Sequence, residues 1–289
     1  MNNNLNKLKP FKILGKGSEG VVILTHDNRY SVKIYRKNPN ENIMLINIIH
    51  YFLNIDLPKT IYITYIITSR KNSLNLPNYF SYINLKDYET LSNKYKMKTR
   101  IFEIMKTYKY TLYDFIKKNL LNHNIKISFL QQGILTLLWL YMEKGIIHGD
   151  VNANNFFIQK TNKNIFSIKI RGEKFDVKLY GYYIIFGDFG YAKSIELVDS
   201  DKFPEQKKLN ILSQTLNPWF DIVEFINLFN NELNINIDEL SMKIYMKTNN
   251  LFREMIKSYI KDESTLHENI IKFKDKYFEF IKNNIINIF

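Results

Sequence analysis

The chain has 289 residues, of which 45% are hydrophobic and 24% charged, which is typical of a globular protein with a sizeable core. It contains no cysteine, which excludes disulfides, thiolate zinc sites and cysteine nucleophiles and fits a reducing compartment. The formal net charge of +13 would attract acidic proteins or nucleic acids, but a genome rich in A/T codons explains the same excess of lysine.

Neither end of the sequence nor its apolar segments predict a membrane protein. Residues 1–10 are polar and lack the apolar stretch of a secretory signal. The longest apolar segment, residues 129–142, is interrupted by Gln131 and Gln132 and is too short to span a bilayer. We therefore expect a cytoplasmic protein that does not associate with membranes.

The predicted elements change character along the chain. The β-prone runs of the first hundred residues are 11–14, 20–25, 30–35 and 61–68. One helix is predicted among them, over residues 41–53. Beyond Tyr110 the apolar spacing predicts helices, over residues 128–143, 221–229 and 251–260, the first ended by Gly145. A β-rich first part and a helical second part predict an α+β fold with two lobes.

A glycine motif lies near the start of the chain. The segment Gly15-Lys16-Gly17-Ser18-Glu19-Gly20-Val21-Val22 matches the pattern G-x-G-x-x-G-x-V. Glycines let the backbone approach phosphate oxygens closely, because no side chain holds it away. A dinucleotide-binding motif would need a helix directly after the glycines, whereas β-prone residues follow here. The motif therefore predicts a hairpin over phosphates.

A lysine lies inside the next predicted strand. Lys33 is surrounded by apolar residues, so its charge needs an anionic partner. Glu41 opens the following predicted helix and is the partner we expect. The sequence alone leaves open a second reading, in which Lys33 extends its ammonium group into water from an edge strand.

The strongest signal is the segment 146–158, which places Asp150 and Asn155 on one loop between a helix and an apolar strand. Asp150 can accept the proton of a substrate hydroxyl. Asn155 offers a neutral oxygen to Mg²⁺, a cation that prefers oxygen ligands. Farther along, Asp188 follows an apolar strand and precedes Phe189 and a flexible glycine, where its carboxylate would hold Mg²⁺ at nucleotide phosphates.

In this order, the glycine motif, Lys33, the Asp150 loop and Asp188-Phe189-Gly190 resemble a eukaryotic-type protein kinase. The similarity extends from about residue 11 to at least residue 229. Residues 105–108 stand where the family has its hinge, whose backbone binds adenine. Asp221 resembles the aspartate of the family's central C-lobe helix, which ties back to the backbone of the catalytic loop.

The resemblance implies one kinase domain over residues 1–289, with a small β-rich N-lobe at about 1–105, a hinge at 106–108 and a larger, mainly helical C-lobe at 109–289. It implies transfer of the γ-phosphoryl group of Mg-ATP to protein serine or threonine, the residue specificity being a default of the family. The catalytic residues would be Asp150, Lys33 and Glu41, and the ligands of Mg²⁺ would be Asn155 and Asp188. The residues expected to contact ATP are Gly15, Lys16, Gly17, Ser18, Glu19, Gly20, Val22, Lys33, Met105, Lys106 and Tyr108.

The sequence departs from the family at several points. Gly149 replaces the arginine that normally receives an activation-loop phosphate, so a switch of that kind is not expected. The resulting His-Gly-Asp sequence is similar to casein-kinase-I relatives, to kinases of large DNA viruses, and to aminoglycoside and choline kinases. Asn152 stands where serine/threonine kinases have a lysine. No convincing A-P-E motif follows Asp188; residues 203–205 are the nearest match.

The interval between Asn155 and Asp188 is longer than in typical members of the family. Its alternating polarity predicts a hairpin, with strands over residues 165–170 and 175–179 and a turn at 171–174. The basic residues of this hairpin are Lys169, Arg171, Lys174 and Lys178. They face either solvent or an acidic partner.

Three other functions stay open on the sequence. The first is a small-molecule kinase of the aminoglycoside or choline type, which the His-Gly-Asp sequence favours. The second is a non-catalytic nucleotide-binding scaffold, and the third a nucleic-acid-binding protein without kinase activity. We expect a monomer that acts on protein substrates, acidic ones included, and that works in the host-cell cytoplasm if its source is a large DNA virus.

Overall fold

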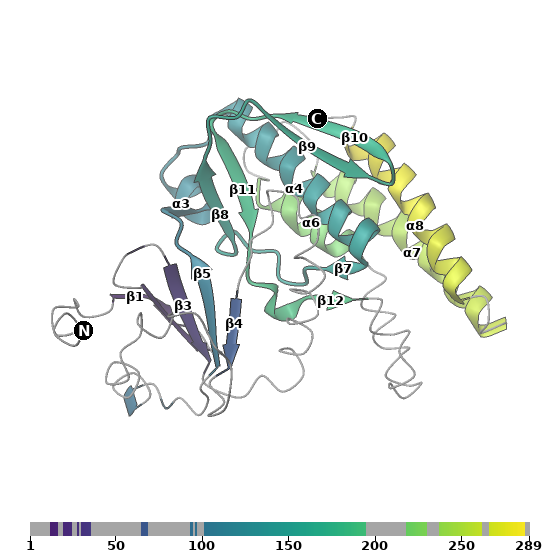
Figure 1. The fold of residues 1–289 in the computed structure, drawn as a ribbon. Coiled ribbons are helices and arrows are strands. Elements are labelled where there is room, and N and C mark those ends of the chain that lie inside the picture. Colours follow the sequence, from purple (N-terminus) through teal and green to yellow (C-terminus); the bar gives the residue numbers. More distant parts are fainter. Residues whose placement is uncertain are drawn as a thin grey trace, which may run out of the picture. The chain divides into compact units, whose positions relative to one another are not determined.

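In the computed structural model the chain divides into two compact units, Met1–Tyr51 with Ile63–Tyr108 and Phe52–Tyr62 with Lys109–Phe289 (Figure 1). The structure describes residues 12–16, 20–24, 28, 30–35, 65–68, 93–94, 96, 101–194, 218–229, 237–261 and 266–286. Small, mainly antiparallel sheets and several helices place the protein in the α+β class, as predicted.

The first unit contains a five-stranded antiparallel sheet in the order β1-β2-β3-β5-β4. Its strands are β1 (Lys12–Lys16), β2 (Gly20–Leu24), β3 (Tyr30–Tyr35), β4 (Tyr65–Thr68) and β5 (Ile101–Lys106). In β3, consecutive residues from Ser31 to Tyr35 are buried. Because neighbouring side chains point to opposite faces of a strand, β3 is covered on both faces.

Four of these strands coincide with predicted runs. The prediction for residues 30–35 matches β3 in full, and β4 covers the described end of the run 61–68. β5 is not among the predicted strands, because Glu103 interrupts its apolar run. The predicted helix over residues 41–53 lies outside the described residues.

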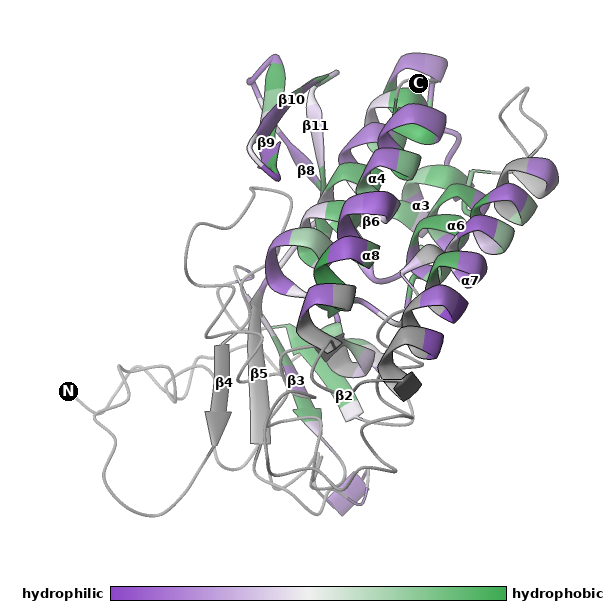
Figure 2. Cartoon of the chain, turned by 90° about the vertical axis from the view of Figure 1, so that its right-hand side faces the viewer, coloured by the Kyte–Doolittle hydropathy of each residue, from purple (hydrophilic) through white to green (hydrophobic). Residues whose placement is uncertain are grey.

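The second unit is built around one long helix, α4 (His123–Lys144), which contacts α6 and α8 as well as the strands β9, β10 and β11 (Figures 1 and 2). The other elements of this unit are β6 (Tyr110–Thr111), α3 (Leu112–Lys117), β7 (Ile146–Ile147), β8 (Phe156–Lys160), β9 (Ile165–Ile170), β10 (Glu173–Lys178), β11 (Tyr182–Phe186), the 3-10 turn η3 (Phe189–Tyr191), β12 (Lys193–Ser194), α6 (Trp219–Asn227), α7 (Ile237–Lys261), α8 (Leu266–Ile281) and the π-helical turn η7 (Lys282–Ile286).

Buried polar side chains fix α4 against the strands. The Ser128 hydroxyl donates to the Lys178 carbonyl (2.8 Å), and Gln132 Oε1 accepts from the Ile184 amide (3.1 Å). Gln132 Nε2 also donates to Ser128 Oγ (2.9 Å), so the two side chains form one connected network. Because each buried polar group has a partner, the network avoids the cost of an unsatisfied group.

Among the described helices, α4 is long and apolar enough to cross a membrane, but 83% of its most apolar window is buried inside the fold. The predicted length of 16 residues at most was wrong, because the helix begins at His123 and has 22 residues. Its first turn is polar and gives little apolar signal; the start is marked instead by Asn122, whose side chain caps the Ile125 amide at 2.9 Å. Its predicted end at Gly145 is confirmed.

The remaining helices differ more from the predictions. α6 begins at Trp219, close to the predicted start at residue 221. α7 begins at Ile237, well before residue 251, and α8 is not among the predicted helices. In the described part of the first half of α7, Ile244 and Thr248 are buried, whereas Met242, Tyr245 and Met246 are exposed. Apolar side chains on the exposed face therefore obscure the helical pattern near its start.

The predicted hairpin between Asn155 and Asp188 is confirmed as β9 and β10, paired from Glu173 opposite Ile170 to Lys178 opposite Ile165. Its turn consists of Arg171 and Gly172 alone, both with positive φ (51° and 85°), as a two-residue hairpin turn requires. The predicted turn over residues 171–174 was too long, because Glu173 and Lys174 already belong to β10.

Candidate active site

Two strand pairs bring the loop that carries Asp150 beside the segment that carries Asp188. β7 pairs with β12, with Ile147 opposite Lys193, and β8 pairs with β11, with Phe156 opposite Phe186. The loop 148–155 and the segment 187–192 are the connections between these strands. Because both are fixed at both ends by the same two strand pairs, they lie next to each other although they are far apart in the sequence.

The backbone of the Asp150 loop is held by Asp221, in the first turn of α6. Its carboxylate is 4% exposed and accepts hydrogen bonds from the amides of His148 (2.6 Å) and Gly149 (3.0 Å). The predicted tie between Asp221 and this loop is confirmed. Burial raises the pKa of the Asp221 carboxyl, while the nearby His148 and the two backbone hydrogen bonds oppose that rise.

The His148 side chain braces the loop that carries Asp150. The side chain is fully buried, and its Nε2 lies 3.0 Å from the carbonyl oxygen of Gly187. That carbonyl can only accept, so Nε2 carries the proton and Nδ1 is free to accept from the Asp150 amide (3.4 Å). The ring also packs against Phe189, with centroids 4.7 Å apart. These contacts agree with a bracing role for His148 rather than acid–base chemistry.

Asp150 and Asn155 form a hydrogen-bonded pair. Asn155 Nδ2 donates to the Asp150 carbonyl (2.9 Å) and to Asp150 Oδ2 (2.8 Å). Both side chains are partly exposed. These two bonds do not involve Asp150 Oδ1 or Asn155 Oδ1. Each side chain can therefore offer one oxygen atom to a ligand.

Asp188 lies directly after β11 and is linked to the same loop. The Gly187 amide donates to the Asn155 carbonyl (3.0 Å), which fixes the backbone next to both predicted metal ligands. Asp188 itself has left-handed backbone angles (φ 54°, ψ 66°), a conformation that aspartate tolerates better than most residues. The structure therefore brings Asp150, Asn155 and Asp188 together on adjoining segments.

The oxygen atoms of Asn155 and Asp188 suit Mg²⁺ but do not make a complete protein site. No group of three or more histidine, cysteine, aspartate or glutamate side chains gathers for a metal ion within the described ranges. Mg²⁺ is commonly bound by one or two carboxylates together with substrate phosphates rather than by a closed protein cage. The donor set thus fits a cation that arrives with a nucleotide.

In the first unit, the glycine motif and Lys33 lie on adjacent strands. Val22 in β2 is the register partner of both Gly15 in β1 and Lys33 in β3. Lys16 lies in β1 and Gly20 in β2. Gly17, Ser18 and Glu19 lie outside the described residues.

Lys33 is 8% exposed, and its Nζ lies 5.2 Å from the ring centroid of Tyr35. Glu41, its predicted partner, lies outside the described residues. At the register position directly opposite Lys33 the sheet has another acidic residue, Glu103 in β5. The sequence analysis did not consider Glu103 as a partner for Lys33, because β5 was not predicted. An acidic residue within the otherwise apolar run 101–105 was the signal that could have indicated it.

The predicted hinge region begins at the end of β5. Met105 and Lys106 belong to β5 and pair with Ser31 and Tyr30 of β3, and Thr107 and Tyr108 follow the strand. Burial raises the pKa of the Tyr108 hydroxyl.

One contact had no signal in the sequence. Gly149 has φ +75°, and a Cβ atom placed on it would lie 2.5 Å from the Tyr191 carbonyl oxygen. The segment after Asp188 therefore touches the loop before Asp150 through backbone atoms.

Comparison of the chain with protein-family models and with curated proteins finds no match.

Proposed function

We propose that this protein is a kinase that transfers the γ-phosphoryl group of Mg-ATP to serine or threonine hydroxyls of proteins. The observation that carries the proposal is the hydrogen-bonded pair of Asp150 and Asn155, on a loop fixed by Asp221 and adjoining Asp188. The two-lobed kinase arrangement is part of the proposal, with the sheet that holds Lys33 as the small lobe and the helical second unit as the large one.

In the proposed reaction the acceptor's hydroxyl oxygen attacks the γ-phosphorus, the bond from that phosphorus to the β–γ bridging oxygen breaks, and ADP leaves. The proton of the hydroxyl passes to Asp150. The hydrogen bond from Asn155 to Asp150 Oδ2 orients the carboxylate, so that Oδ1 can accept from the incoming hydroxyl. Such positioning supplies much of the rate enhancement in reactions of this type.

The remaining polar residues would bind the nucleotide. Asn155 and Asp188 would hold Mg²⁺, which neutralises charge on the phosphates when it is bound. Lys33 would bind the α- and β-phosphates, and the glycine motif would cover them with backbone amides. The buried position of Lys33 favours an anionic partner, because an unpaired charge in an apolar strand is costly.

The test is phosphoryl transfer from γ-labelled Mg-ATP to casein, to a basic protein and to the enzyme itself. We expect label on serine or threonine, and Asp150→Asn should lower turnover by about 10²–10⁴-fold, the usual contribution of a positioned general base. The matched control is Glu268→Gln, which removes one exposed carboxylate on α8 and should leave turnover unchanged.

Other outcomes would redirect the assignment. Near-normal turnover in Asp150→Asn would refute its role as the base. Transfer to aminoglycosides or choline but to no protein would favour the small-molecule kinase, and nucleotide binding without any transfer would favour the scaffold.

A further inference from the structure

The hairpin β9–β10 has one buried face and one exposed face, and the hydropathy alternates along both strands (Figure 2). The inner face consists of Phe166, Ile168, Ile170 and Val177, all buried. The outer face consists of three directly opposite pairs, Lys169 with Lys174, Ser167 with Asp176, and Ile165 with Lys178.

The hairpin is fixed to the rest of its unit at the turn. The Arg171 amide donates to Glu143 of α4 (2.6 Å), and the Arg171 guanidinium forms an ion pair with Asp275 of α8. Lys282 of η7 pairs with Glu173 at 2.7 Å. Arg171 therefore serves to anchor the turn, and the outer face keeps three lysines.

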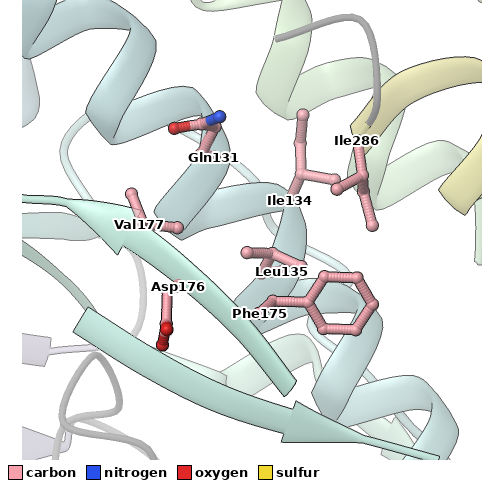
Figure 3. Close-up of a pocket in the computed structure, with 7 residues that line it drawn as sticks. All are labelled: Gln131, Ile134, Leu135, Phe175, Asp176, Val177 and Ile286. Atoms are coloured by element: carbon pink, nitrogen blue, oxygen red, sulfur yellow. The ribbon is translucent and has the colours of Figure 1, made fainter. Parts of the chain in front are cut away.

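A cavity under the hairpin is too small to explain a ligand there. It has a volume of about 60 Å³ and lies between α4, β10 and η7 (Figure 3). Its lining residues are Gln131, Ile134, Leu135, Phe175, Asp176, Val177 and Ile286. Ligand pockets for organic molecules are several times larger, so any partner of the hairpin has to bind its outer face.

The charge of the outer face is not balanced. Asp176 is its one acid, and it is already engaged by Lys174 (2.8 Å) and by the Ser167 hydroxyl (2.5 Å). Lys169 is exposed, stands directly across from Lys174 and has no acidic partner among the residues that the structure describes. Like charges directly opposite each other destabilise a sheet, and an anion between them would remove that cost.

We propose that the outer face of the hairpin β9–β10 docks an acidic segment of the protein substrate, so this inference rests on the proposed kinase function. Lys169, Lys174 and Lys178 attract carboxylate or phosphate groups of the segment, and Ile165, which is 55% exposed, contacts an apolar side chain beside them. A protein is favoured over nucleic acid because this face carries no exposed aromatic ring on which a base could stack.

The test is binding of a fluorescent glutamate-rich peptide, which lacks hydroxyl residues, to the full-length protein. The Lys169→Glu/Lys174→Glu variant should bind at least about tenfold more weakly, and the affinity of the unmodified protein should fall with added salt. The matched control, Lys243→Glu/Lys247→Glu, makes the same charge change on the exposed face of α7 and should bind as the unmodified protein does. Lys169→Gln, which removes the like-charge pair without adding an acid, should bind about threefold more weakly and keeps the test valid if the double variant fails to fold.

A kinetic readout separates this proposal from the kinase assignment. With casein as substrate, the hairpin variants should raise the KM for casein and leave kcat and the KM for ATP unchanged.

Equal loss of peptide binding in both double variants, or no salt-dependent peptide binding at all, would overturn the docking proposal even if phosphoryl transfer is intact. If the hairpin variants lose affinity for a single-stranded DNA oligonucleotide but keep their affinity for the peptide, the docking proposal is overturned in favour of a nucleic-acid partner. Absence of phosphoryl transfer would overturn the kinase function, while peptide binding would still report on the face.

Discussion

Gly149 has a backbone conformation on which the loop that carries Asp150 depends. Its φ of +75° lies in the left-handed region, and a Cβ atom would lie 2.5 Å from the Tyr191 carbonyl oxygen. We expect Gly149→Ala to destabilise the second unit by more than the ~1–2 kcal/mol that left-handed backbone costs an L-residue. Because the clash pushes on the segment that follows Asp188, turnover should fall as well.

The matched control is Gly172→Ala in the hairpin turn, where φ is +85° but no atom lies within 4 Å of the added Cβ. This variant should show the backbone cost alone and keep its turnover. Urea unfolding of the full chain, followed by circular dichroism, measures the free energy of unfolding of both variants. Equal losses of stability in the two variants would show that the Tyr191 contact contributes nothing.

In the second unit, the sequence singles out individual residues where a motif ties one residue type to one position. Asp150, Asn155, Asp188 and Asp221 are recognised as single positions in the sequence, and the structure brings them to adjoining segments. The contact of Gly149 with Tyr191 could not be predicted, since it depends on how two distant backbone segments approach each other. The sequence shows only that a glycine replaces an arginine there.

At the scale of elements, α6 stabilises the loop that carries Asp150 through Asp221. Asp221→Ala would leave the amides of His148 and Gly149 without their acceptor, at a cost of about 1–3 kcal/mol for the buried His148 amide and less for the part-buried Gly149 amide. Turnover should fall with stability, because the loop that carries Asp150 loses its support. The control Glu224→Ala, on the same helix, should change both quantities little.

The pH dependence of stability gives a second readout at Asp221. Because burial raises its pKa, the folded protein binds this proton more tightly than the unfolded chain does. The resulting contribution to stability is complete below the unfolded pKa and is lost as pH rises through the folded pKa. Asp221→Asn should therefore show a smaller loss of stability between acid and neutral pH, and an unchanged pH profile would contradict this assignment of the proton.

Elements whose apolar residues are continuous or strictly alternating were predicted, and a helix whose apolar residues are interspersed with charged ones was not. The strict alternation of β9 and β10 and the apolar centre of α4 determine those elements locally. In α8, the buried Phe273, Tyr277, Phe278 and Ile281 are separated by lysine and acidic residues. They lie at i, i+4, i+5 and i+8, the spacing of one helix face that packs against α7 and α4, so the local pattern for this helix was present and was missed.

At the scale of the whole molecule, the proposed function requires both units to act on one nucleotide, since Lys33 belongs to the first and Asp188 to the second. A non-hydrolysable ATP analogue with Mg²⁺ should then stabilise the folded protein, by about 2.7 kcal/mol at a concentration 100 times its Kd. Thermal unfolding with and without Mg²⁺ measures the effect. Lys33→Met and Asp188→Asn should each reduce it, and only Asp188→Asn should remove its dependence on Mg²⁺, because the lysine contacts phosphate directly while the aspartate acts through the cation.

Asp176→Asn, a loss of one carboxylate in the hairpin, is the control and should keep the full stabilisation. Stabilisation that does not depend on Mg²⁺, or that survives in Asp188→Asn, would contradict the metal-ligand role of Asp188, and stabilisation unaffected by Lys33→Met would remove the first unit from nucleotide binding.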